Sequence, residues 1–226
     1  MKVVLKLGGH VFPLNLNSGK ILGYAGLLKK LWREDYEIVV VTGGGEAARK
    51  YIKIARELGG SELICDLIGI EVSRLNALIL ITSLGSVAYP EPPKTIGELK
   101  KAFEVGKIVV MGGLQPGQST NAVGVLSAEA IGADLLINAT DVDGVYTEDP
   151  KKIATAKRLD LIRTDELLKL VLDCKLWAGS YELFDPVAIK IIERSKVLAR
   201  VIDGRRPENI ERVVKGEALG TLIKPA

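Results

Sequence analysis

Short apolar runs alternate along the chain with longer stretches in which apolar residues recur every three or four positions. The short runs are rich in Val, Ile and Leu and hardly alternate with polar residues, which is typical of parallel strands buried on both faces. We expect strands at 3–7, 38–41, 107–111, 135–139 and 198–202. The longer stretches predict amphipathic helices, and these cover 22–32, 47–58, 70–84, 122–131, 165–172 and 186–195.

The order of these elements predicts an α/β fold. Strand and helix alternate repeatedly, which favours an open, mainly parallel, doubly wound sheet with right-handed crossovers in a three-layer α/β/α sandwich. Asp185 before Pro186 is typical of a helix N-cap with proline at the first helical position. The loop at 89–93 (YPEPP) has the same strand type on both sides, so we expect one domain, 1–226, with lobes of about 1–130 and 131–226.

Charge and composition restrict the partners. The 226 residues carry a formal net charge of +3 and no run of Lys and Arg with interleaved aromatics, so we expect no nucleic-acid partner. A bilayer-spanning apolar stretch and a signal-peptide pattern are both lacking, so we expect no membrane partner. Cys65 and Cys174 have no metal-ligand spacing. They are predicted to be buried free thiols, which indicates a cytoplasmic location.

Glycine-rich turns follow the first two predicted strands, where ligands bind in sheets of this kind. The turn at 6–10 (KLGGH) lets the backbone approach a ligand closely, and its lysine suits a phosphate. The turn at 42–45 (TGGG) precedes a helix whose N-terminus attracts anions, and Arg49 follows about one turn later. Both turns predict phosphate contacts, although a plain surface turn is the alternative in each case.

Two further segments follow the next two strands. The loop at 112–120 (GGLQPGQST) nearly matches the phosphate-loop pattern, but Gln118 stands where that pattern needs lysine. It still offers backbone N–H groups and hydroxyls at a helix start, which suit a phosphate, or it is an ordinary strand-to-helix loop. The segment at 139–150 (ATDVDGVYTEDP) predicts an acidic cap for adenine or ribose, or else a solvated turn. The spacing of Asp141, Asp143 and Asp149 is not that of an EF-hand.

The residues alone therefore favour a site that holds more than one phosphate group. Phosphoryl transfer between two phosphorylated ligands is one interpretation, and a nucleotide sensor without chemistry is the other.

These same motifs resemble the amino acid kinase superfamily, and the resemblance runs from the first strand to the GTLI segment at 220–223. The turns at 6–9 and 41–45, with Ala48 and Arg49, and the segment at 139–146 are similar to the superfamily as a whole. The loop at 112–120 and the segments at 66–70 (DLIGI) and 73–77 (SRLNA) more specifically resemble the archaeal branch of uridylate kinases.

The resemblance implies transfer of the γ-phosphoryl group of ATP to UMP, giving UDP in pyrimidine nucleotide biosynthesis. Lys6 would be the catalytic residue that neutralises the transferred group, and Asp66 would accept hydrogen bonds from the UMP ribose. The ATP site would comprise Lys6, Gly8, Gly9, His10, Gly45, Arg49, Thr140, Asp141, Tyr146 and Asp149. The UMP site would comprise Gly44, Asp66, Leu114, Gln115, Pro116, Gly117, Gln118, Ser119 and Thr120.

The resemblance also implies Mg²⁺ as a cofactor, held mostly by phosphate oxygens rather than by protein ligands. A homohexamer built as a trimer of dimers would follow, with helices 22–32 and 70–84 as candidate interfaces. Isopentenyl phosphate or carbamate kinases are alternatives, but the former would carry a histidine in the second glycine turn, where Thr42 stands. A non-catalytic nucleotide-binding member is expected to lose Lys6 or Arg49, and both are present.

Overall fold

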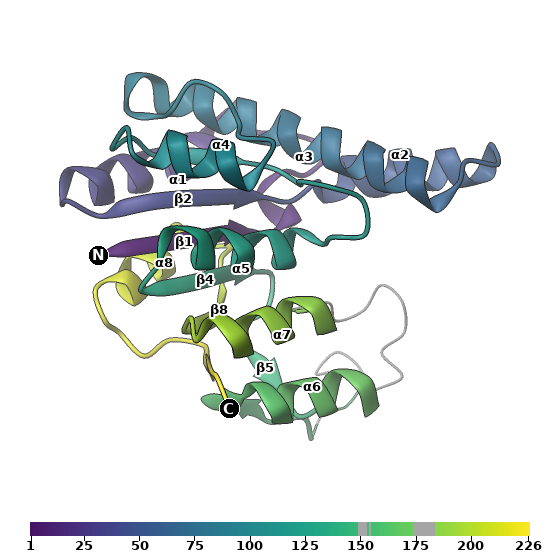
Figure 1. Ribbon diagram of the computed structural model, residues 1–226, viewed down its shortest axis with the longest axis vertical. Coiled ribbons are helices and arrows are strands. Elements are labelled where there is room, and N and C mark those ends of the chain that lie inside the picture. Colours follow the sequence, from purple (N-terminus) through teal and green to yellow (C-terminus); the bar gives the residue numbers. More distant parts are fainter. Residues whose placement is uncertain (149–152, 154, 174–183) are drawn as a thin grey trace.

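A seven-stranded sheet forms the centre of the protein (Figure 1). The structure, a computed structural model, describes residues 1–148, 153, 155–173 and 184–226. The sheet has the order β3-β2-β1-β4-β8-β9-β7. Its strands are β1 (Lys2–Leu7), β2 (Glu37–Thr42), β3 (Val109–Met111), β4 (Leu135–Thr140), β7 (Leu161–Arg163), β8 (Ala199–Asp203) and β9 (Thr221–Lys224). All neighbouring strands in it are parallel except β8 and β9.

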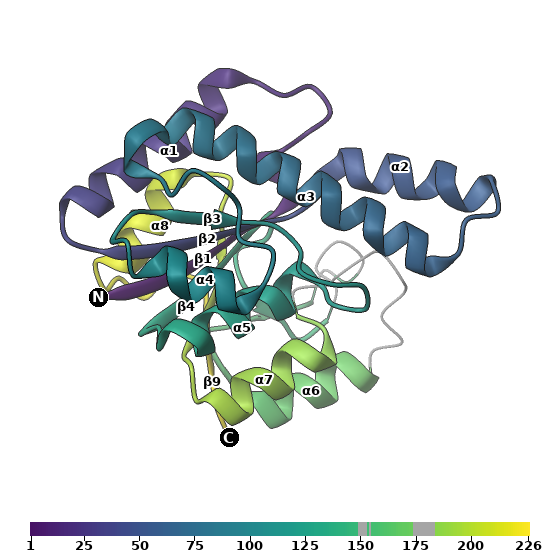
Figure 2. The ribbon, with the colours of Figure 1, turned by 45° about the horizontal axis from the view of Figure 1, so that its top comes forward.

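Helices cover both faces of this sheet, as Figures 1 and 2 show from two directions. One core cluster contains side chains of α1 (Ser18–Arg33), α3 (Glu62–Leu84) and α8 (Pro207–Val214). The opposite cluster contains side chains of α4 (Ile96–Phe103), α5 (Thr120–Ile131), α6 (Thr164–Asp173) and α7 (Pro186–Ser195). The predicted three-layer α/β/α sandwich with a mainly parallel sheet is therefore confirmed.

The apolar runs of the strands serve both cores. In β1, Val3, Leu5 and Leu7 belong to one cluster and Val4 belongs to the other. Because successive side chains of a strand point to opposite faces, a strand buried on both sides needs apolar residues on both faces. This explains why the strand sequences scarcely alternate with polar residues.

The predicted strands and helices are present, with shifted ends. The largest shift is in α3, which begins at Glu62 rather than at residue 70, because Ser61 caps it by accepting a hydrogen bond from Ile64 N at 3.4 Å. The sequence patterns missed two helices, α4 and α8, the strands β7 and β9, and the two-stranded pair of β5 (Val145–Tyr146) and β6 (Arg158–Leu159). These elements are short, and the two helices have only eight residues each, so the chain offers few repeats from which their periodicity can be recognised.

The helix α2 (Gly45–Glu57) pairs with the first half of α3, and the two extend beyond the sheet (Figure 2). Asp185 caps α7 as predicted, since its Oδ1 accepts a hydrogen bond from Ala188 N at 3.0 Å. Cys65 is a buried free thiol as predicted, whereas Cys174 lies outside the described residues. Among the helices that the structure describes, none has the length and apolarity to cross a membrane.

Candidate active site

A cleft of about 690 Å³ lies at the carboxyl ends of β1, β2 and β4. This is the edge at which open α/β sheets bind ligands. Many of the predicted site residues line it together: Lys6, Gly8, Gly9, His10, Gly44, Gly45, Arg49, Asp66, Gln118, Ser119, Thr120, Thr140 and Asp141. The structure thus brings four segments to one cavity: the glycine turns at 6–10 and 42–45, the end of the third loop (112–120) and the start of the acidic segment (139–150).

Other predicted site residues do not line the cleft. These are Leu114, Gln115, Pro116 and Gly117, at the outer part of the third loop, and Tyr146 in β5. Asp149 lies outside the described residues. A role for these residues in ligand binding stays a prediction.

The first two glycine turns pack against each other through their backbones. A Cβ atom at Gly9 would lie 2.5 Å from Gly45 Cα, so no other residue fits there without displacing the second turn. Gly45 has a φ of +68°, and a Cβ there would lie 2.6 Å from Phe12 O. Glycine is therefore required at both positions for steric reasons. The backbones of both turns line the cleft with no side chain in between.

His10 lies half-buried at the wall of the cleft. Burial lowers its pKa from the ordinary 6.5, and the nearby charge of Lys20 acts in the same direction, against a hydrogen bond with the Gly204 backbone. Lys20 also donates from Nζ to His10 O at 2.7 Å, which fixes the turn to α1. The imidazole is therefore neutral at pH 7. Its Nε2 atom is buried and has no hydrogen-bond partner within the described residues.

Side chains of α3 hold the second turn in place. Asn76 donates from Nδ2 to Gly43 O at 2.8 Å and to Gly44 O at 3.3 Å. Thr42 at the end of β2 donates in return to Ser73 O at 2.8 Å. All these groups are buried or nearly so, and a buried polar group that is hydrogen-bonded fixes its neighbours closely.

Side chains of α3 also hold the third loop through hydrogen bonds. Ser73 Oγ accepts a hydrogen bond from Gly113 N at 2.7 Å, and Asp66 Oδ2 accepts one from Gly117 N at 2.8 Å. Arg74 donates to the carbonyls of Gly113 and Leu114. Gly112 passes so close to the helix that a Cβ atom would lie 2.6 Å from Ser73 Oγ. The shape of the loop is therefore set largely from one helix.

Ser119 joins the ends of two helices. Its Oγ accepts hydrogen bonds from Asn121 N and Ala122 N, both at 3.1 Å, and so caps α5. The same hydroxyl donates to Asp185 Oδ2, whose other oxygen caps α7. A ligand that binds Ser119 has to share a hydroxyl that already makes these contacts.

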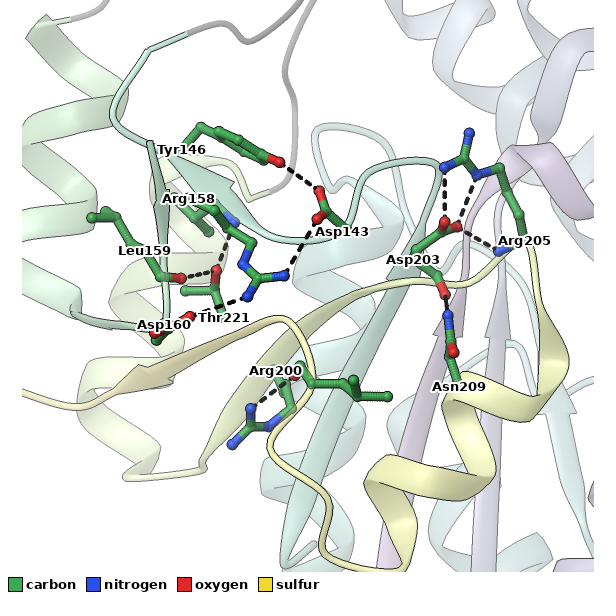
Figure 3. A network of polar contacts seen from close by, with 12 residues as sticks. Asp143, Tyr146, Arg158, Leu159, Asp160, Arg200, Asp203, Arg205, Asn209 and Thr221 are labelled. Carbon is green, nitrogen blue, oxygen red and sulfur yellow. Dashed lines mark hydrogen bonds and ion pairs between the residues drawn. The ribbon is translucent and has the colours of Figure 1, made fainter. Parts of the chain in front are cut away.

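The acidic segment is held by cations and hydroxyls, which Figure 3 shows. Tyr146 donates from its hydroxyl to Asp143 Oδ1 at 2.8 Å, and this bond raises the tyrosine pKa. Arg158 pairs with Asp143 at 3.3 Å on the other side. Asp203 and Arg205 form a separate pair at the end of β8, with the closest contact at 2.7 Å. The acidic segment is therefore a turn with internal partners, and its role as a cap for adenine and ribose stays a prediction.

Sequence reasoning missed several residues of the cleft wall. They are Ala48, Ile52, Gly69, Ile70, Ser73, Gly113, Asn121 and Val142. Those at 69, 70 and 73 follow Asp66 at helical spacing, on one face of α3. Extending the predicted helix back to Glu62 would have placed them beside Asp66, and the cap at Ser61 was the signal for that.

The charged side chains of the cleft bear on whether it fits a metal ion. No group of three or more His, Cys, Asp or Glu side chains that could hold a metal ion occurs in the part of the chain that the structure describes. The cleft is lined by the cations Lys6 and Arg49 and by the carboxylates Asp66 and Asp141. Mg²⁺ prefers to keep waters and to bind phosphate oxygens together with one or two carboxylates, so these residues fit an ion that arrives with a nucleotide.

The sequence and the fold were compared with those of known proteins. The model of the amino acid kinase family matches residues 1–203. The chain is 50% identical to the uridylate kinase of Hyperthermus butylicus over 98% of this chain and 97% of the relative. It is 47% identical to that of Methanococcoides burtonii, over 98% and 94% respectively. The crystal structure of uridylate kinase from Archaeoglobus fulgidus superposes with a TM-score of 0.89 at 45% identity, covering 99% of this chain and 100% of that one. A match of this extent, on a cleft built from the family's glycine turns, places the chain in the amino acid kinase family.

Proposed function

We propose that this chain is an ATP-dependent UMP kinase that forms UDP in pyrimidine nucleotide biosynthesis. The observation that carries the proposal is that Lys6, Arg49 and Asp66 line one cleft. Two cations for phosphates and a carboxylate for ribose hydroxyls thus share the same cavity. The close similarity to proteins named uridylate kinase supports the choice of UMP as the acceptor.

The proposed mechanism is direct in-line transfer, in which the protein orients both nucleotides and neutralises charge. Lys6 lies at the end of β1 and lines the cleft, where its ammonium would stabilise charge on the transferred group. The bared backbones of the turns at 8–9 and 44–45 and the guanidinium of Arg49 would bind the phosphates. Mg²⁺ would supply further charge neutralisation on the phosphate oxygens.

No general base is needed for this reaction, because the acceptor phosphate of UMP is already ionised at neutral pH. His10 agrees with that scheme, since burial lowers its pKa and keeps the ring neutral. We propose that His10 contacts the ATP phosphates as a neutral polar group rather than as a proton carrier.

We assign the acceptor to the side of the cleft that residues of α3 line. Asp66 is exposed to the cleft and uses Oδ2 to bind Gly117 N, which leaves Oδ1 for a ribose hydroxyl. Residues 114–120 would enclose the uracil and the acceptor phosphate. The ATP side would be formed by Thr140, Asp141, Tyr146 and Asp149, so that the lobes of about 1–130 and 131–226 bind acceptor and donor respectively.

A cytoplasmic homohexamer, built as a trimer of dimers, completes the proposal. The outer face of α3 supports it, because Leu63, Leu67, Leu75 and Leu78 are exposed along the helix. A second copy of the chain would cover this apolar face. Sedimentation at micromolar concentration tests the assembly, and a monomer at all concentrations would contradict it.

A coupled assay of ATP consumption with Mg²⁺ tests the activity, with UMP, CMP, dUMP, AMP and isopentenyl phosphate offered in parallel. Turnover on UMP in clear excess over the others is the expected result. Turnover on another acceptor alone would keep the donor site and discard UMP. Absence of turnover on all five, in protein that binds ATP, would favour a nucleotide-binding protein without chemistry.

A further inference from the structure

Arg74 of α3 binds the third loop but does not line the cleft. Its Nε donates to Gly113 O at 3.1 Å and its Nη2 donates to Leu114 O at 3.1 Å. The remaining nitrogen, Nη1, pairs with Glu71 Oε1 at 2.7 Å. The Arg74 side chain is only 15% exposed. Its two bonds to the loop are part-buried, whereas its pair with Glu71 is exposed. Hydrogen bonds of a charged donor are stronger where water is partly excluded.

The loop itself has little that would fix its shape. It contains Gly112, Gly113 and Gly117, the last with a φ of +76°. Glycine loses more conformational freedom on ordering than any other residue, so a loop of this composition depends on outside contacts. The guanidinium supplies two donors in a rigid plane to two successive carbonyls, which fixes the direction of the chain where it leaves β3.

The same helix holds the loop further along. Asp66 binds Gly117 N, and Ser73 binds Gly113 N. Both side chains line the cleft, so a change at either alters the cavity itself. Arg74 does not line it, and therefore its contribution to the loop can be separated from direct contact with a ligand.

The two glycine turns have supports of their own. The second turn is held by Asn76, and the first turn is tied to α1 by Lys20. Neither contact involves Arg74. A loss of the Arg74 bonds is therefore expected to disturb residues 113–118 and to leave both glycine turns in place.

We propose that Arg74 is a positioning residue that sets the affinity for the acceptor nucleotide by ordering residues 113–118. This inference rests on the proposed function, because it assigns that loop to UMP. A merely structural role would lower stability without discriminating between the two substrates.

Two variants and a matched control separate these possibilities. Arg74→Met keeps much of the apolar stem and removes the donors, while Arg74→Lys keeps the charge but carries its N–H donors on a single nitrogen in place of the planar fork. Arg56→Met is the control. Arg56 also forms a two-pronged pair with an acid of α3, Glu62, at 2.7 and 2.6 Å, but it lies at the exposed tip of the helical pair and has no contact with the loop.

Steady-state kinetics and amide hydrogen exchange on the intact protein provide the test. Arg74→Met should raise the KM for UMP at least tenfold and keep the KM for ATP within twofold. Exchange of the amides of 113–118 should rise in the ligand-free protein. Arg74→Lys should be intermediate in both measurements, and Arg56→Met should match the parent.

An unchanged KM for UMP in Arg74→Met, with the parent active, would overturn the inference, as would equal rises in both KM values. If the parent shows no turnover on any acceptor, the proposed function has failed, and the exchange measurement then decides on its own. Unchanged exchange at 113–118 in both Arg74 variants would overturn the positioning role.

Discussion

The bond between Ser119 and Asp185 predicts a measurable energetic coupling between the N-termini of α5 and α7. Ser119 Oγ accepts two backbone N–H bonds at 3.1 Å and donates to Asp185 Oδ2. Ser119→Ala removes the cap and leaves Asp185 without that donor. Asp185→Ala removes the cap of α7 and leaves the serine hydroxyl without its acceptor.

The expected magnitudes follow from these contacts. Loss of an N-cap costs about 1 kcal/mol, and loss of a hydrogen bond to a charged group costs roughly 1.5 kcal/mol. We lower the second figure to about 1 kcal/mol because both groups are only part-buried. Each single substitution should therefore lower the free energy of unfolding by about 2 kcal/mol. The double variant should lose about 3 kcal/mol rather than 4, because the shared bond can be lost only once.

Urea unfolding of the parent, both single variants and the double variant measures this coupling, with the slope m checked for constancy. Ser61→Ala is the control, because Ser61 caps α3 at 3.4 Å and has no contact with Asp185. It should cost about 1 kcal/mol and add to Asp185→Ala without coupling. Additivity of Ser119→Ala and Asp185→Ala within about 0.3 kcal/mol would refute the reasoning.

Three further predictions concern the cleft. Lys6→Ala should lower kcat with UMP on the order of 10²-fold, and a value within threefold of the parent would remove Lys6 from the catalytic residues. Because burial lowers the pKa of His10 below 6.5, the unfolded chain takes up its proton first as the pH falls. Urea unfolding should show stability decreasing from pH 6.5 downward, until the folded ring also titrates, and His10→Asn should flatten this dependence. Gly112→Ala should lower the free energy of unfolding by about 1–3 kcal/mol through overpacking against Ser73. Gly23→Ala, on an exposed face of α1 with open space around it, should leave stability unchanged or raise it. Urea unfolding of both glycine variants beside the parent measures these effects.

The sequence was sufficient for the layers of the fold and for the edge at which the cleft lies. Strands such as β2 (Glu37–Thr42) could be found because burial on both faces leaves a continuous apolar run, here at 38–41. The antiparallel strand β9 could not be found in this way, since its four residues, Thr221–Lys224, include a polar residue at each end. Its direction is set by its pairing with β8, which is not local information.

The candidate site was predictable where glycines let the backbone approach a ligand closely. It was less predictable where side chains from α3 hold the loops in place. The glycines at 8–9 and 44–45 signal close approach directly from their identity. Arg74 and Asn76 give no such signal, because a polar residue in a helix is usually solvated. Their contacts with the loops at 43–44 and 113–114 depend on how α3 crosses the ends of β2 and β3, and only the packed structure gives that.

The contact between Gly9 and Gly45 has a consequence for the evolution of the site. Because Gly9 lies against Gly45 along the main chain, the closest approach of the two turns is set by backbone atoms rather than by the side chains that line the cleft. Substitutions elsewhere in the cleft can therefore change which acceptor is selected while the distance between the turns is inherited unaltered. Lineages that diverge in substrate could keep one transfer geometry for as long as both glycines persist.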